Sequence, residues 1–148
     1  MTGWSMLWPP DTSQYQHIGF SNDIPPNGGA WSLEIDSLYD SNIKLATYVD
    51  LPHVNHRYKL SFWAKTKGLD DQVSLMVTGR GWHVSYGKVT PITDSIWKEY
   101  TITSEYMDSL YQQVPDSIRV FQIILDKSND RMRSGKANFD LFKLEQTD

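Results

Sequence analysis

Residues 57–65, RYKLSFWAK, constrain the fold of this chain more than any other segment, because their hydrophobicity alternates with period two. Strand side chains point alternately to the two sides of a sheet, so apolar residues at every second position predict one buried face. The positions between them are polar apart from one Trp, as in an antiparallel strand with one solvated face. We therefore predict the central strand of a sandwich here. The residues predicted to point inward are Tyr58, Leu60, Phe62 and Ala64.

Further segments with β-type alternation predict strands that pair with this one or pack across from it. In the first of them Trp31, Leu33 and Ile35 are expected to point inward. Together the segments predict an all-β protein, an antiparallel β-sandwich of jelly-roll type. The predicted strands are residues 31–36, 43–49, 73–78, 97–103, 118–126 and 137–144.

Three segments interrupt this pattern. Residues 1–26 contain four prolines and no sustained alternation, so we expect them to be irregular. Residues 25–29, PPNGG, predict a tight turn in which the two glycines take positive φ. Residues 104–114 carry apolar side chains at helical spacing before Pro115, which predicts one short helical insertion.

Composition limits the classes of function. At 148 residues the chain suits one domain, residues 1–148. A net charge of −4 with scattered Lys and Arg argues against nucleic acid. No run approaches the ~20 apolar residues of a membrane span, so we expect no membrane insertion. The first ten residues lack a secretory signal pattern, as expected of a mature or excised domain. There is no cysteine, so a disulfide scaffold is excluded.

Two groups of polar residues resemble catalytic or metal sites without completing one. Glu34 and Asp36 lie two apart on a predicted strand, but no third acid follows them, and retaining hydrolysis needs two carboxyls ~5 Å apart across the bond. We expect both to be surface acids. His53 and His56 lie in a predicted loop without a third ligand, whereas zinc needs three or four. Of the functions considered for this chain, a small hydrolase is therefore the least favoured.

Residues 79–88 predict a sugar-binding surface. Sugars bind by stacking on aromatic rings while polar side chains fix their hydroxyls, and this glycine-punctuated segment supplies both groups. Trp82 and Tyr86 are the candidate platforms, although Trp82 packing beneath the loop is the alternative. Tyr48 lies on the non-core face of its strand, where its ring either faces the same groove or lies on the sheet. The candidate polar groups are Arg80, His83, Lys88 and Gln122.

Four pieces stand in an order that resembles the carbohydrate-binding modules of the family 4, 9 and 22 type. They are GAWSLEI at 29–35, YKLSFWAK at 58–65, WKEYTIT at 97–103 and NFDLFKL at 138–144. The resemblance covers about residues 28–144. It implies a galactose-binding-like fold and a non-catalytic module that binds a polysaccharide or oligosaccharide in an aromatic-lined groove.

The resemblance carries further expectations. It implies a ligand of the β-glucan, xylan or xyloglucan class, an extracellular or cell-surface location and a larger multidomain parent protein. The alternative is an extracellular adhesion or protein-interaction sandwich without a sugar site.

The resemblance also bears on individual residues. Tyr86-Gly-Lys88 resembles the Tyr-Gly-Arg segment that lies beside the cleft in family 4 modules. No cofactor is required, but such modules often hold a structural calcium ion. Asp140 matches the family's Asp of the last strand, and Asn27 stands where an acidic loop ligand would be. The family's Gly-Phe-Glu-like N-terminal motif has no match here, and calcium needs six to eight oxygens.

Overall fold

The computed structural model is built from two stacked β-sheets. It describes residues 5–8, 15–37, 43–50, 57–68, 73–79, 85–89, 92–103, 120–127 and 135–147. The predicted helix at 104–114 and the histidines at 53 and 56 lie outside these ranges. Within them, no helix is long and apolar enough to cross a membrane.

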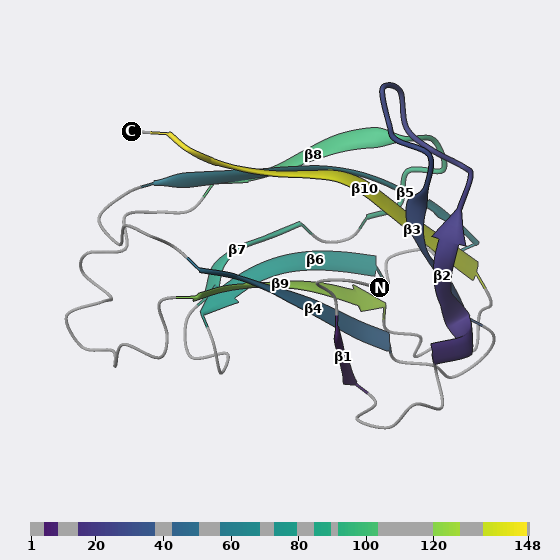
Figure 1. The fold of residues 1–148 in the computed structure, drawn as a ribbon, viewed down its shortest axis with the longest axis horizontal. Coiled ribbons are helices and arrows are strands. Elements are labelled where there is room, and N and C mark those ends of the chain that lie inside the picture. The colour runs from purple at the N-terminus through teal and green to yellow at the C-terminus, as the bar shows by residue number, and fades with distance from the viewer. Residues whose placement is uncertain are drawn as a thin grey trace.

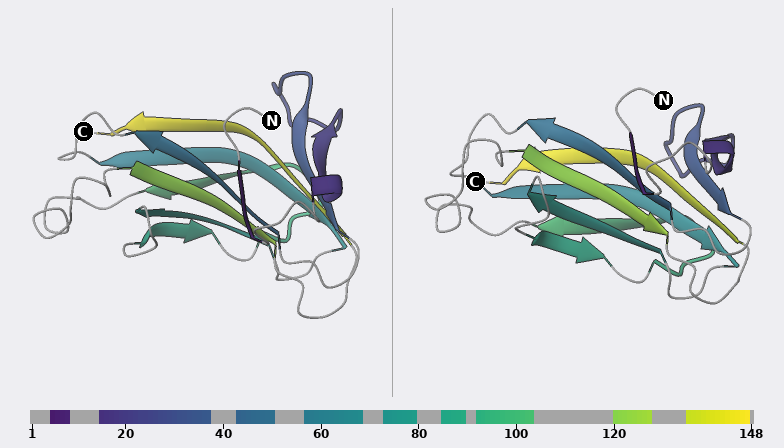
Figure 2. Two further views of the ribbon diagram at one scale, coloured as in Figure 1. Left: turned by 60° about the horizontal axis from the view of Figure 1, so that its bottom comes forward. Right: turned by 90° about the horizontal axis from the view of Figure 1, so that it is seen from below.

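Each sheet has five strands, and every pairing between them is antiparallel. Figures 1 and 2 show the two layers. We call the lower layer in Figure 1 sheet A and the upper layer sheet B. Sheet A has the order β1-β4-β9-β6-β7, with bounds Ser5–Trp8, Ile43–Asp50, Val120–Lys127, Val73–Gly79 and Ser85–Val89. Sheet B has the order β2-β3-β10-β5-β8, with bounds Ile18–Ser21, Ser32–Ser37, Gly135–Gln146, Tyr58–Lys67 and Lys98–Thr103. The predicted antiparallel sandwich is confirmed.

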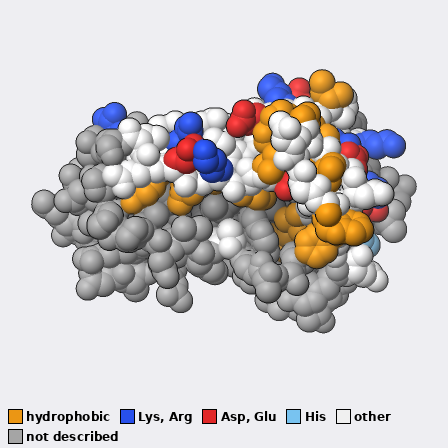
Figure 3. All heavy atoms as spheres, turned by 45° about the horizontal axis from the view of Figure 1, so that its top comes forward, with side chains coloured by type: hydrophobic (Ala, Val, Ile, Leu, Met, Phe, Trp, Pro, Cys, Tyr) orange, Lys and Arg blue, Asp and Glu red, His pale blue; other side chains and the backbone are white. Residues whose placement is uncertain are grey.

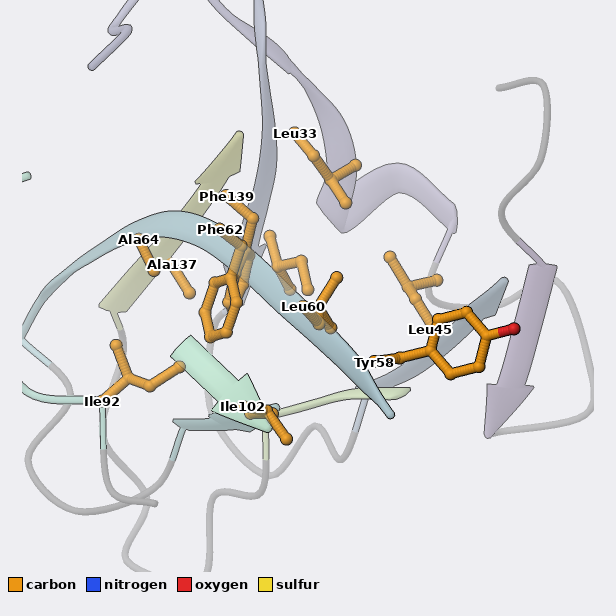
Figure 4. Close-up of a cluster of buried hydrophobic side chains, with 11 residues drawn as sticks. Leu33, Leu45, Tyr58, Leu60, Phe62, Ala64, Ile92, Ile102, Ala137 and Phe139 are labelled. Atoms are coloured by element: carbon orange, nitrogen blue, oxygen red, sulfur yellow. The ribbon is translucent and has the colours of Figure 1, made fainter. Parts of the chain in front are cut away.

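The hydrophobic core lies between the two sheets, and most of its described residues come from the inner face of sheet B (Figure 4). Phe62 on β5 is fully buried, and its ring stacks on Tyr100 at 5.5 Å and on Phe142 at 5.9 Å between centroids. All four residues predicted to point inward from β5 are buried, because alternation places them on one face. The buried apolar residues are Leu33, Ile35, Leu45, Tyr58, Leu60, Phe62, Ala64, Ile92, Ile102, Ala137 and Phe139.

Two predictions about sheet B are wrong. The central strand is β10, which pairs with β3 on one side and with β5 on the other, so β5 is its neighbour. Trp31 was expected to point inward, but it lies one residue before β3 and 61% of its surface is exposed. The alternation of Leu33 and Ile35 is confirmed, but it does not extend into the preceding loop.

The described residues of the N-terminal segment, 5–8 and 15–26, contain more regular structure than predicted. Residues expected to be irregular form β1, the short 3-10 helix η1 (Tyr15–His17) and β2, which pairs with β3 at the edge of sheet B. These elements have three or four residues each, too few for an alternation pattern to identify.

The predicted turn at 25–29 is present, with a hydrogen bond of 2.9 Å from the Gly28 amide to the Pro25 carbonyl. Positive φ, however, falls on Asn27 (61°), a residue type that tolerates this conformation. Gly28 is needed for space instead, since a Cβ there would lie 2.9 Å from the Pro25 carbonyl oxygen.

Candidate functional site

The register of sheet A determines which positions share its outer face. Residues paired across neighbouring strands form a row and share one face of the sheet. Leu45 is buried, and its row continues through Leu125 and Leu75 to Val89. Val89 packs against the core. Positions one step away therefore lie on the opposite, outer face. Tyr48 on β4 is paired there with Gln122 on β9, which is paired in turn with Thr78 on β6.

Strand β7 brings one further predicted residue to this outer face. Lys88 is paired with Met76, which shares a row with Ile124 on β9. The register shifts between Val77 and Thr78, and Tyr86 lies at this bulge between their partners Gly87 and Ser85. Tyr48, Gln122 and Lys88 thus occupy neighbouring rows on one face of sheet A. The other predicted ligand-binding residues, Arg80, Trp82 and His83, lie outside the described residues.

The outer face of sheet B is crossed by two loops that meet. Asp23 follows β2 at one edge of the sheet, and Trp97 precedes β8 at the opposite edge. Asp23 forms an ion pair with Lys65 on β5 and accepts a 3.0 Å hydrogen bond from the Trp97 indole nitrogen. The Lys65 ammonium also lies 5.4 Å from the centre of the Trp97 ring. We call residues 22–31 the covering loop; it rises above sheet B in Figure 1.

Beneath this crossing, a hydrogen-bonded network is buried on the outer face. Asn138 on β10, 4% exposed, donates to the Ser32 hydroxyl at 3.2 Å and to Glu34 Oε2 at 3.1 Å. The Ser32 hydroxyl, fully buried, donates to the Asp23 carbonyl at 2.6 Å. Lys136 binds Glu34 at 3.1 Å and Asp36 at 3.3 Å. Glu34 and Asp36 are therefore held by β10 as an ion-paired structural group.

The same contacts set the ionisation of two acids. The pKa of Asp23 lies below its ordinary value, chiefly because of the hydrogen bond from Lys65, with burial opposing and Trp97 adding to the effect. Burial acts to raise the pKa of Glu34, but hydrogen bonds from Asn138 and Lys136 outweigh it and the pKa is lowered. Both carboxylates are thus stabilised in the charged form.

A pocket of about 480 Å³ opens between this network and the loop before β8. Its described lining is polar and charged, and it contains no aromatic residue. The lining residues are Ser21, Asp23, Glu34, Lys65, Thr66, Lys67, Ser95, Lys136 and Asn138. We call it the polar pocket. Exposed hydrophobic side chains gather instead toward the β2–β3 end of this surface (Figure 3), and the large exposed ones are Phe20, Ile24, Trp31 and Ile96.

Asp140, the predicted metal ligand, lies against the covering loop. Its Oδ1 accepts a 2.7 Å hydrogen bond from the Leu141 amide, whereas its Oδ2 is buried without a partner among the described residues. A Cβ on Gly28 would lie 3.0 Å from that Oδ2 and 2.9 Å from the Pro25 carbonyl oxygen, so both oxygens converge on the turn. Leu141 has a φ of 52°, which is unusual for a bulky residue and marks strain.

This arrangement fits a cation in part. An unpartnered carboxylate oxygen near a carbonyl is the donor chemistry that calcium prefers. The described residues nevertheless contain no group of three His, Cys, Asp or Glu that could hold a metal. Asn27, the second predicted ligand, belongs to the same turn and is exposed.

Sequence reasoning missed the polar pocket and its network. Asn138 and Ser32 alternate with core residues, and alternation alone does not predict that the opposite face of the sheet is covered. Their burial depends on the covering loop and on Trp97, which lie far away in the sequence. One feature of the sequence could have indicated the network: opposite charges on two strands that pair, with Lys136 opposite Asp36.

Neither a protein-family model nor a curated protein matches the chain. Solved structures do match its fold. An enzymatically active domain of bacteriophage CBA120 tailspike protein 4 has a TM-score of 0.64 at 11% identity, over 88% of this chain and 18% of that one. This chain therefore spans under a fifth of the length of that structure's chain.

Two matches are modules of similar length. A CBM4 carbohydrate-binding module has a TM-score of 0.62 at 14% identity, over 98% of this chain and 95% of that one. The xylan-binding CBM22-1 domain of Paenibacillus barcinonensis Xyn10C has a TM-score of 0.61 at 14% identity, over 97% and 85%. The chain therefore shares the β-sandwich fold of these two carbohydrate-binding modules.

Proposed function

We propose that this protein is a non-catalytic module that binds a polysaccharide or oligosaccharide chain across the outer face of sheet A. The observation that carries the proposal is the register that places Tyr48, Gln122 and Lys88 in neighbouring rows of that face. An extended sugar chain needs such a linear set of aromatic and hydrogen-bonding groups. The CBM4-like fold over nearly the whole chain supports the same function.

Each residue has a proposed role. Tyr48 and Tyr86 supply rings for the apolar faces of sugar units, and Gln122 and Lys88 supply hydrogen bonds to hydroxyls. Trp82 is the proposed principal platform. In the sequence, two polar residues lie within two positions of it, Arg80 and His83.

The proposed ligand is a β-glucan, xylan or xyloglucan. Xylan binding by the similar CBM22-1 domain supports this class. We further propose an extracellular or cell-surface location within a larger protein, as for the match that fills only 18% of a tailspike domain. In that context the module would hold a partner domain close to its polymer.

Native gels cast with β-glucans, xylan and xyloglucan test the binding, beside a reducing-sugar assay on the same polymers. We expect retardation without release of sugar. Trp82→Ala should remove about 2 kcal/mol or more of binding free energy, as for a buried aromatic anchor, and Tyr48→Ala a smaller amount. Trp31→Ala removes an exposed aromatic outside this face and is the control. Unretarded migration in every polymer would reject the proposal, and sugar release would indicate a hydrolase.

We also propose Asp140 as a ligand of a structural calcium ion, with Asn27 and the Pro25 carbonyl contributing from the turn. The buried, unpartnered Oδ2 of Asp140 supports this site. Calcium would supply the missing partner and fasten the turn to β10. The remaining oxygens of its shell would be backbone carbonyls and waters.

Thermal melting with calcium and with chelator tests this site. A bound ion stabilises the native state by mass action, so chelator should lower the melting temperature of the parent. Asp140→Asn should melt at the same temperature in both conditions. A parent whose melt is identical with calcium and with chelator holds no such ion.

A further inference from the structure

The polar pocket is independent of the proposed glycan face, since it lies on the outer face of sheet B, across the core from sheet A. Its floor is formed by residues in register on three strands. Glu34, Asn138 and Lys65 form one row, and Lys136 and Lys67 lie side by side in the next. Its volume of about 480 Å³ is within the usual range of small-molecule sites.

The lysines of the pocket are unequally neutralised. Lys65 is paired with Asp23, and Lys136 with Glu34 and Asp36. Lys67 is exposed and has no ion pair within the described part of the chain, although it stands directly opposite Lys136. Like charges opposite one another destabilise a sheet. The three lysines are thus matched in number by Asp23, Glu34 and Asp36, but Lys67 alone makes no direct ion pair among the described residues.

The rest of the lining consists of groups that bind hydroxyls. Ser21 and Ser95 supply hydroxyl groups, and the Glu34 carboxylate is an acceptor. Asn138 is fixed in place by its bonds to Ser32 and Glu34, so its amide is held without freedom to rotate. With no aromatic residue in the described lining, the pocket lacks the stacking platform that a neutral glucan chain requires.

We propose that the polar pocket binds a carboxylated sugar, a uronate unit, with its carboxylate between Lys67 and Lys136. The hydroxyls of the sugar then face Asn138, Glu34 and Ser95. An anionic group supplies the ion-pair partner that Lys67 lacks, which a neutral sugar cannot do. The hydroxyl-binding groups in turn favour a sugar acid over a simple anion.

Heteronuclear NMR titration of the whole protein tests the proposal. The probes are D-glucuronate, D-galacturonate and an oligogalacturonate, with D-glucose and D-galactose as neutral counterparts. We expect the uronates to shift the backbone amides of Thr66, Lys67 and Asn138 and to leave those of β4 and β9 unchanged. The oligomer distinguishes a chain-borne uronate from a free one. Equal shifts with neutral sugars, or no shift at these three amides, would overturn the proposal.

Two matched variants remove one positive charge each. Lys67→Gln should weaken uronate binding about two- to fivefold, the range of an exposed charged contact. Lys143→Gln, on the part of β10 beyond the pocket, should leave it unchanged. An equal loss in both variants would show a general charge effect and reject the site.

The two proposed sites fail separately. Tyr48→Ala should weaken retardation in polysaccharide gels while leaving uronate binding intact, and Lys67→Gln should do the reverse. Uronate binding by a protein that no neutral polymer retards would refute only the glycan face.

Discussion

The two faces of sheet B are built from the same strands but are held in different ways. On the inner face, Phe62, Ile35 and Phe139 are excluded from water by apolar neighbours. On the outer face, Asn138 and Ser32 are excluded just as fully, but by polar and charged neighbours. Apolar burial needs no particular orientation, whereas each buried polar atom needs its partner.

The inner face therefore contributes mainly to stability, whereas the outer face mainly fixes the positions of side chains. The inner face contributes through contact area, so its loss is large and independent of pH. The outer face contributes through hydrogen bonds and ion pairs whose net contribution is modest and whose strength depends on protonation. The polar pocket lies on the second kind of surface, where side chains are fixed in position.

The largest effect is expected from Phe62→Ala, which breaks the inner face. Phe62 is fully buried and stacks on two rings, so we expect a loss of about 3–5 kcal/mol in the free energy of unfolding. Urea denaturation followed by Trp fluorescence measures it. Trp31→Ala, at a residue 61% exposed, should change little. Similar losses in both variants would mean that Phe62 is not the core residue described.

A smaller effect is expected from Asn138→Ala, which breaks the outer face. The change removes two hydrogen bonds and leaves the Glu34 carboxylate with fewer donors, at a cost of about 1–3 kcal/mol. The same urea titration measures it, with the exposed Thr101→Ala on β8 as control. A loss as large as that of Phe62→Ala would contradict the distinction between the faces.

The smallest effect is the response to acid. Asp23 and Glu34 have lowered pKa values, so the folded protein binds fewer protons than the unfolded chain. Their stabilisation is complete above their unfolded pKa values of about 4 and is lost as the pH falls through the folded ones. Since Asp23 is half exposed, Asp23→Asn should cost under about 1 kcal/mol at neutral pH and less in acid.

Urea midpoints measured across this pH range test the sign. Phe62→Ala should keep the pH slope of the parent, because no acid of the inner face is altered. Asp23→Asn should flatten it. A slope that Asp23→Asn leaves unchanged would show that this carboxylate is not held by Lys65 and Trp97.

The inner face could be predicted from sequence because alternation encodes it directly. Tyr58 to Ala64 take every second position, and burial follows. Trp31 shows the limit of this method: it has the same parity as Leu33 and Ile35, but the strand begins at Ser32. Alternation cannot indicate where a strand gives way to a loop.

The outer faces were less predictable. Tyr48 and Gln122 were placed on non-core faces by parity alone, and the register pairs them directly. Their role in binding stays a prediction. The polar pocket was not foreseen, since it forms only when the segments around Asp23 and Trp97 meet across three strands. Such contacts between distant segments leave no local pattern.

The bulge in β10 reverses which alternate residues of this strand face the core. Ala137 and Phe139 face the core before it, and Phe142 and Leu144 do so after it, at positions of opposite parity. Asp140 is paired with Trp63 and Lys143 with Ser61, so one residue is inserted relative to β5. Without Leu141 the strand would alternate without interruption. Deleting Leu141 should therefore alter the setting of Asp140 while Phe142 and Leu144 keep their places in the core.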